Sequence, residues 1–277
     1  MSLDAITARL TKARAEANTT KNDASRAVYA IDRALEELEA VTLPDVPPPP
    51  VSQPGWGLPD FSGIEMAVWD WGKPFAPSEW GEPKLGGYDW KSANVRIASG
   101  KLELNITEKA SGQVQANDAG LLTKARWEVD VTLPTMKPGL IAAPLWTYDS
   151  KGQADELDFE VVGTKGLTLT IWASVNGKKE SVWDNGGKPI IPGDLSGKRY
   201  KLAIDYEAGK VVAFYIDDKE VARVTPADCP KGFPKEKQKA FIDLWVANGL
   251  DAGWAGKWTP LRKGHALTMT VHGYRQS

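Results

Sequence analysis

The chain of 277 residues has a single cysteine, Cys229, and no long apolar run. One cysteine excludes an intrachain disulfide and leaves the redox compartment open. No stretch approaches the roughly 18 consecutive apolar residues of a membrane-spanning helix, so we expect no membrane segment. The opening residues MSLDAITARLTKARAEA also lack the apolar stretch of a secretory signal, so no signal peptide is visible.

Excess basic charge is absent too, because 34 Lys and Arg residues stand against 36 Asp and Glu residues and the net charge is -2. A nucleic-acid-binding domain usually carries a basic patch, so we expect no nucleic-acid partner. Histidine is scarce, and His265 and His272 do not have metal-ligand spacing. The 12 tryptophans are, by contrast, many for this length. We expect them to pack a core, to line a binding surface, or to do both.

Residues 1–42 are predicted to form one amphipathic helix. Their apolar side chains recur at alternating spacings of three and four, the a/d pattern of a coiled coil, and only Thr20 interrupts them. A long helix with nothing to bury this stripe is marginal alone. We therefore expect residues 3–41 to form a homo-oligomer, with a trimer favoured, or to dock onto a partner; packing on the chain's own domain is the alternative. The positions are Leu3, Ile6, Leu10, Ala13, Ala17, Thr20, Ala24, Ala27, Ile31, Ala34, Leu38 and Val41.

A proline-rich linker follows, LPDVPPPPVSQPG at residues 43–55. Proline ends a helix, and four consecutive prolines favour an extended, semi-rigid spacer. Residues 56–277 then show many short β-rich runs separated by turn signals and no helical periodicity, which is typical of an all-β sandwich or barrel. The runs include NVRIAS, KLELNIT, RWEVDVTL, ELDFEVV, LTLTIWASV, YKLAIDY, VVAFYID, AFIDLWV and ALTMTVHGY.

One of these runs, DELDFEVVG, places like charges in a row. On a strand, Leu157 and Phe159 point into a core while Glu156, Asp158 and Glu160 share the other face, about 7 Å apart. Such crowding raises at least one carboxyl pKa. Cleavage of a glycosidic bond needs this combination, a carboxylic acid that protonates the leaving oxygen and a carboxylate that attacks or activates water. The alternative is that the three acidic side chains simply face solvent at the edge of a sheet and have no catalytic role.

The run ELDFE resembles the Glu-x-Asp-x-Glu strand of glycoside hydrolase family 16. Segments in the expected order on either side are also similar to that family, namely GLLTKARWEVDVTLP, GLIAAPLWTYDSKGQADELDFE, RYKLAIDYEAGKVVAFYIDDKEVARV and FIDLWVANGLDAGWAGKW. The resemblance covers most of residues 60 to 277. It departs from the family pattern where Arg199 replaces a usual His and Tyr206 replaces a usual Trp, which puts the details of substrate binding in doubt.

The resemblance implies an all-β, two-sheet jelly roll with a substrate cleft on its concave face. It also implies a retaining endo-β-glycanase with Glu156 as nucleophile, Glu160 as general acid and base, and Asp158 holding the proton balance between them. The substrate would be a β-1,3/1,4-glucan or a bacterial exopolysaccharide. No cofactor is required; many relatives hold a structural calcium, but no ligand cluster for it is visible in this sequence.

Aromatic rings stack on sugar faces, and side-chain amides hydrogen-bond sugar hydroxyls. We expect substrate contacts from six residues, against the alternatives of core packing for the tryptophans and turn roles for the asparagines. They are Trp146, Trp172, Trp245, Trp254, Asn176 and Asn248.

The helical segment and spacer are unusual beside such a domain. Without a leader, they suit a virion-associated depolymerase of a bacteriophage, and we expect extracellular action on a polysaccharide. Two other functions stay open from sequence. A non-catalytic lectin-like module could sit on the same stalk, since jelly rolls also bind carbohydrate. A transglycosylase would use the same carboxylates but pass the sugar to another sugar.

Overall fold

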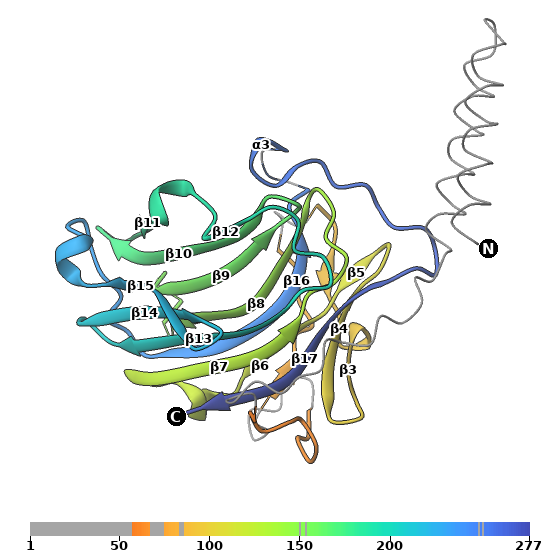
Figure 1. The fold of residues 1–277 in the computed structure, drawn as a ribbon, viewed down its shortest axis with the longest axis horizontal. Helices are drawn as coiled ribbons and strands as arrows, with labels where there is room; N and C mark the ends of the chain where they lie inside the picture. The colour runs from red at the N-terminus through yellow and green to blue at the C-terminus, as the bar shows by residue number, and fades with distance from the viewer. Residues whose placement is uncertain are drawn as a thin grey trace, which may run out of the picture. The chain divides into compact units, whose positions relative to one another are not determined.

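The computed structural model describes residues 57–277 apart from 67–74, 83–85, 150, 153, 249 and 251. The predicted helix (1–42) and the proline-rich linker (43–55) lie outside these residues. The described part is an all-β sandwich of two antiparallel sheets, which confirms the predicted fold class (Figure 1). Among the described residues, no helix is long and apolar enough to span a bilayer.

The first sheet, which we call the cleft sheet, is built around β9. Its order is β1 (Phe75–Pro77), β6 (Gln113–Ala116), β16 (Gln238–Val246), β8 (Leu140–Asp149), β9 (Glu156–Val162), β10 (Gly166–Val175) and β11 (Lys178–Trp183), with β12 (Ile191–Pro192) also paired to β10. All of these pairings are antiparallel.

The second sheet, which we call the outer sheet, packs against the cleft sheet. Its order is β15 (Lys219–Val224), β14 (Val211–Ile216), β13 (Arg199–Glu207), β7 (Lys124–Thr132), β17 (Leu267–Gln276), β4 (Lys101–Ile106) and β3 (Val95–Ala98). Smaller elements are the parallel pair β2 (Asp89–Trp90) and β5 (Ala110–Ser111), the short helix α3 (Ala252–Ala255), and 3-10 turns at Ser92–Asn94, Asp118–Gly120, Asn185–Gly187 and Pro226–Asp228.

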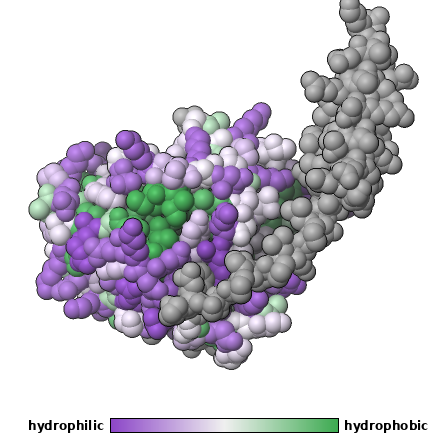
Figure 2. Space-filling model, viewed as in Figure 1, coloured by the Kyte–Doolittle hydropathy of each residue, from purple (hydrophilic) through white to green (hydrophobic). Residues whose placement is uncertain are grey.

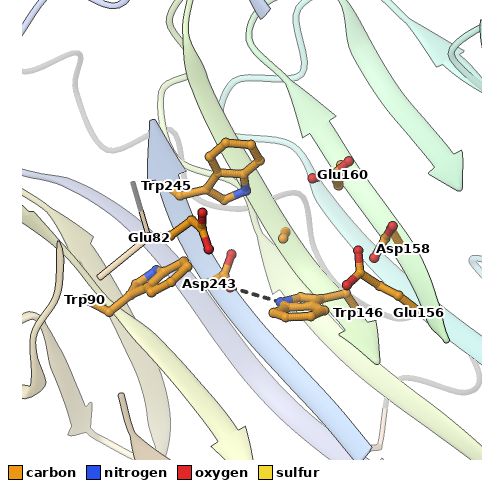
Figure 3. Close-up of a pocket in the computed structure, with 9 residues that line it drawn as sticks. Glu82, Trp90, Trp146, Glu156, Asp158, Glu160, Asp243 and Trp245 are labelled. Carbon is orange, nitrogen blue, oxygen red and sulfur yellow. Dashed lines mark hydrogen bonds between the residues drawn. The ribbon is translucent and has the colours of Figure 1, made fainter. Parts of the chain in front are cut away.

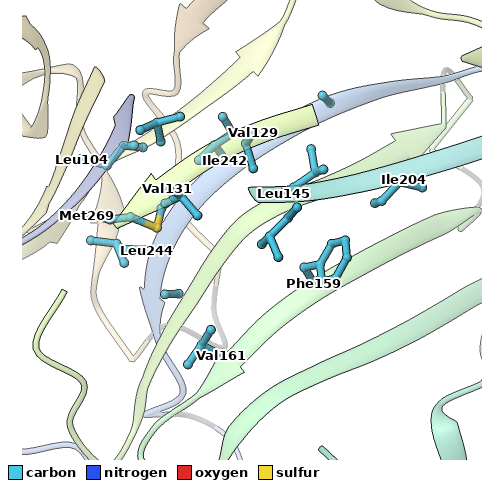
Figure 4. Packing of buried hydrophobic residues seen from close by; sticks show 14 of the residues in the cluster. Leu104, Val129, Val131, Leu145, Phe159, Val161, Ile204, Ile242, Leu244 and Met269 are labelled. Carbon is cyan, nitrogen blue, oxygen red and sulfur yellow. The ribbon is translucent and has the colours of Figure 1, made fainter. Parts of the chain in front are cut away.

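The core lies between the two sheets and fixes which way β9 faces. Leu157 and Phe159 are fully buried, and the Phe159 ring meets Phe214 of the outer sheet edge to face at 5.2 Å. Figure 4 shows Phe159 and Val161 among apolar side chains from both sheets. Burying one such side chain stabilises the fold by about 1.5–3 kcal/mol. Slipping β9 by one residue would bury the carboxylates instead, so the register is strongly specified.

A hydrophobic area is visible on one face of the molecule. Figure 2 shows it as a green area in the middle of the viewed face, with polar residues around it. Trp254 is the exposed large hydrophobic residue of the described chain, and it belongs to the cleft described below rather than to the core.

The two departures from the family pattern lie on β13 of the outer sheet, away from β9. Arg199 donates two hydrogen bonds to Asp130, and the hydroxyl of Tyr206 donates to the carbonyl of Glu236 at 2.7 Å. The Tyr206 ring also stacks on buried Trp127 at 6.1 Å. Both residues therefore have structural partners in the outer sheet.

A bulge in β8 lies directly beside the carboxylate row. Ala142 pairs with Val161 and Leu145 with Phe159, so Ala143 and Pro144 together stand opposite Glu160. Proline has no N–H to give to a sheet, and a bulge is one of the few places where a central strand tolerates it. Bulges re-aim neighbouring side chains and are frequent beside active sites.

Candidate active site

The three carboxylates of β9 line one face of the cleft sheet, on the side away from the core. A cavity of about 160 Å³ contains all three together with side chains from β2, β8 and β16 (Figure 3). A second cavity of about 660 Å³ contains the same three carboxylates and continues over β10 and β11. The two cavities form a cleft that crosses the middle of β9. The first is lined by Glu82, Trp90, Ala143, Trp146, Asp243 and Trp245 in addition to Glu156, Asp158 and Glu160.

Asp158 occupies the centre of the row and is 4% exposed. Its Oδ2 accepts a hydrogen bond from the Trp172 indole Nε1 at 2.9 Å. Burial, followed by the negative charges of Glu156 and Glu160, raises the pKa of Asp158 well above its ordinary value. This shift favours the neutral carboxylic acid form of Asp158.

Glu160 is the second carboxyl group whose proton is retained. Burial is the main cause that raises its pKa from 4.5 to about 8, and the charges of Glu156 and Asp243 add to the effect. A carboxyl group with this pKa is protonated at neutral pH, and it can donate its proton to an oxygen atom in the cleft.

Glu156 has a different environment, because a cation lies against it. The Lys179 Nζ is 2.5 Å from the Glu156 Oε2. Burial alone would lower the pKa of Lys179, but the charge of Glu156 and the hydrogen bond to it raise that pKa above its ordinary value. The row therefore contains two carboxyl groups whose pKa burial raises and one that is paired with an ammonium group. Such divergence between neighbouring carboxyls is the usual sign of acid and base assignments.

Asp243 of β16 adds a fourth carboxyl group to the cleft. Its Oδ2 accepts a hydrogen bond from Trp146 Nε1 at 3.0 Å (Figure 3). The same oxygen accepts a second hydrogen bond from Gln113 Nε2 at 2.5 Å. Its Oδ1 is buried without a hydrogen-bond partner among the described residues. Burial raises the pKa of Asp243 to about 7, against the lowering effect of the two hydrogen bonds.

The four tryptophans expected at the substrate all line the cleft. Trp146 and Trp172 flank the carboxylate row, and their indole nitrogens hold Asp243 and Asp158. Trp245 and Trp254 pack together with ring centroids 5.8 Å apart, and Trp254 is 38% exposed. Both rings line the larger cavity, which also contains Glu160.

The two asparagines lie elsewhere. Asn176 and Gly177 form the two-residue turn between β10 and β11, with φ values of 51° and 77°. Asn248 is exposed and follows the end of β16. Gly86 packs closely against it, because a Cβ added to Gly86 would lie 2.4 Å from the Cβ of Asn248. Neither lines the two cavities that contain the carboxylates.

Sequence reasoning missed Asp243 and Lys179. The alternation of FIDLWV places Asp243 on the same face as Trp245, which is a signal that could have been used. The Asn-Gly pair is a strong signal for a two-residue hairpin turn, and that turn pairs Ser174 with Lys179. Neither signal reveals that Lys179 pairs with Glu156 or that the charge of Asp243 raises the pKa of Glu160.

The described residues contain no group of three or more His, Cys, Asp or Glu side chains placed to hold a metal ion. Asp243, Asp158 and Glu156 are held by amide, indole and ammonium donors.

Comparison with known proteins identifies the family. Residues 87–261 match the family model described as Glycosyl hydrolases family 16. The chain belongs to this family. It is therefore a glycoside hydrolase, and the retaining double displacement is general to family 16. Comparison with curated proteins gives no significant match.

Solved structures share the fold at low sequence identity. A prokaryotic β-1,3-1,4-glucanase (lichenase) from a mouse hindgut metagenome is 19% identical with a TM-score of 0.57, covering 72% of this chain and 90% of that one. A laminarinase from Flavobacterium sp. UMI-01 is 16% identical with a TM-score of 0.56, covering 78% and 96%. A Bacteroides ovatus family 16 protein in complex with a G4G4G3G product is 14% identical with a TM-score of 0.57, covering 73% and 94%.

The raised pKa of Glu160 makes a prediction about stability. The native state keeps a proton that the unfolded chain loses near pH 4.5, so stability falls as pH rises from there to about 8. We expect Glu160→Gln to raise the melting temperature by several degrees at about pH 9 and by little at about pH 4, because only the ionisable side chain has this cost.

The measurement is thermal unfolding of both proteins across this pH range. Glu180→Gln is the matched control, since Glu180 lies on β11 and outside the two cavities that contain the carboxylates. A gain that is equal at all pH values, or no gain in alkali, would contradict the raised pKa of Glu160.

Proposed function

We propose that the protein is an endo-acting β-glucan hydrolase in which Glu156 is the nucleophile and Glu160 the general acid and base. The observation that carries this proposal is the contrast within one strand face. Glu160 is half-buried and has a pKa raised to about 8, whereas Glu156, four residues earlier on the same face, is paired with Lys179. A retaining glycosidase needs this division, with one carboxyl group protonated and the other charged.

In the first step, a Glu156 carboxylate oxygen attacks the anomeric carbon while Glu160 transfers its proton to the departing glycosidic oxygen. A covalent glycosyl ester on Glu156 results, and Glu160 becomes a carboxylate. In the second step, Glu160 takes a proton from water as the water oxygen attacks the same carbon. The ester bond breaks, and its electron pair returns to Glu156.

Asp158 supports this exchange from between the two glutamates. Its raised pKa favours the uncharged form, which adds no third negative charge to the row. The hydrogen bond from Trp172 fixes the orientation of its carboxyl group. We propose that Asp158 limits the electrostatic cost of placing Glu156 and Glu160 on one face, where three charges would repel strongly.

The proposed substrate class rests on the cleft and on the relatives. Both cavities on β9 are open and contain tryptophan rings that can stack on sugar faces. Among the similar structures, one is a β-1,3-1,4-glucanase and one is a laminarinase. A mixed-linkage β-glucan is therefore the first candidate. A bacterial exopolysaccharide with a β-glucan-like backbone is the second, and the predicted bacteriophage context favours it.

The test is product analysis by mass on a panel of mixed-linkage glucan, laminarin, xyloglucan, agar and bacterial exopolysaccharides. We expect the wild type to release oligosaccharides from at least one β-glucan and Glu156→Gln to lose at least about 1,000-fold in rate, because the amide cannot form the ester intermediate.

Glu180→Gln should keep wild-type activity, since its carboxyl group lies outside the two cavities that hold the row. Equal product release by wild type and Glu156→Gln would overturn the assignment of the nucleophile. Inertness of the wild type on the whole panel would favour the sugar-binding alternative.

We also propose that residues 3–41 assemble the chain or dock it to a partner. The support is the a/d seam in the sequence, and these residues lie outside the described part of the structure. Sedimentation should give an oligomer for the full chain and a monomer for residues 54–277. Monomers in both preparations would contradict the coiled-coil prediction.

A further inference from the structure

The ammonium group of Lys179 is held in place on several sides. Its Nζ lies 2.5 Å from Glu156 Oε2, 5.1 Å from the centre of the Trp172 ring and 5.3 Å from the centre of the Tyr148 ring. Trp172 is itself fixed by its hydrogen bond to Asp158. Cation–π contacts of this length are attractive and reduce the freedom of a long side chain.

Lys179 reaches Glu156 from the far side of β10. Glu156 stands between Tyr148 of β8 and Trp172 of β10, and Trp172 pairs with Ser181 of β11. Lys179 lies two residues from Ser181, on the same face of β11. The lysine therefore extends across Trp172 to a carboxylate two strands away. The pairing of the edge strand β11 with β10 does not require this ion pair.

We propose that Lys179 is a positioning residue that favours the second step of the reaction by stabilising Glu156 as a leaving carboxylate. This inference rests on the proposed role of Glu156 as the nucleophile. It adds that the cation has opposite effects on the two steps, because the charge of Glu156 disappears in one step and returns in the other.

In the first step, the Glu156 carboxylate donates an electron pair to the anomeric carbon and loses its negative charge. The ion pair with Lys179 is lost as the ester forms, so the lysine opposes this step. In the second step, water attacks the anomeric carbon, its proton goes to Glu160, and the electron pair of the breaking ester bond returns to the Glu156 oxygen. Negative charge develops within reach of the waiting ammonium group, which stabilises this transition state.

The competing explanation is that Lys179 only anchors the edge strand. Exposed ion pairs contribute little to stability, and the Lys179 side chain keeps 38% of its exposure. The carboxylate end is different, because the Glu156 side chain keeps only 14%. A merely structural lysine would change stability or the overall rate, whereas the proposed role changes the balance between the two steps.

The experiment uses Lys179→Met, which keeps the aliphatic stem and removes the charge. The substrate is a 2,4-dinitrophenyl β-glycoside of laminaribiose or cellobiose, whose leaving group needs no protonation, so the second step limits turnover. We expect kcat to fall about 10-fold, KM to fall with it, and kcat/KM to stay constant or rise, because kcat/KM reports the first step. A burst of dinitrophenolate equal to the enzyme concentration should precede the steady state.

Two control variants separate charge from structure. Lys179→Arg keeps the cation and should stay within about threefold of the wild-type kcat, although guanidinium and ammonium groups differ in geometry. Lys178→Met removes an exposed lysine on the opposite face of β11 and should behave as wild type. If kcat and kcat/KM fall equally in Lys179→Met without a burst, or if Lys179→Arg is as slow as Lys179→Met, the proposal is wrong.

A direct readout of the second step is the reactivation of the covalent adduct formed with a 2-deoxy-2-fluoro glycoside of the same disaccharide. We expect reactivation of Lys179→Met to be about 10-fold slower than that of wild type. An adduct located on Glu156 with equal reactivation rates would overturn the role of Lys179 alone. An adduct on another residue would overturn the nucleophile assignment and this inference with it.

Discussion

Electrostatic repulsion along one strand face is the constraint on which the site depends. Glu156, Asp158 and Glu160 are forced together because Leu157 and Phe159, on the opposite face of β9, are fully buried in the core. No change of register relieves the crowding without bringing carboxyl groups into the core. The apolar packing of the sandwich thus maintains an unfavourable arrangement of charge. Burial in the cleft is the main cause of the raised pKa values of Asp158 and Glu160, and neighbouring carboxylates raise them further.

Side chains from neighbouring strands stabilise this arrangement of carboxyl groups and give each carboxyl group a different environment. Trp172 on β10 donates to Asp158, Lys179 on β11 pairs with Glu156, and Asp243 on β16 raises the pKa of Glu160. The bulge at Pro144 of β8 breaks the regular pairing opposite Glu160. Different strands therefore act on different members of the row, so that chemically similar side chains acquire different protonation states. Such divergence is what acid and nucleophile roles require.

Local sequence predicted the part of the site that a single strand determines. The alternation in ELDFE identified the carboxylate face, and Trp146 and Trp172 followed from their strands. Asp243 and Lys179 were missed because their contacts with the row depend on pairing between β16, β8 and β9, and between β11, β10 and β9. Strand β16 is distant in sequence from β8 and β9, and the reach of Lys179 depends on the register of two successive hairpins, β9–β10 and β10–β11. The asparagines line neither cavity that contains the carboxylates, and the left-handed backbone of its turn accounts for Asn176.

The most direct test of the account is the pH dependence of kcat/KM on a polysaccharide substrate, which reports the ionisation of the free enzyme. The account predicts an alkaline limb near pH 8, where Glu160 loses its proton. It also predicts that Asp243→Asn moves this limb to lower pH, because the charge of Asp243 is one cause of the raised pKa. An alkaline limb near the ordinary carboxyl pKa, or one that Asp243→Asn leaves unchanged, would contradict the claim that burial and neighbouring carboxylates on the cleft face keep Glu160 protonated.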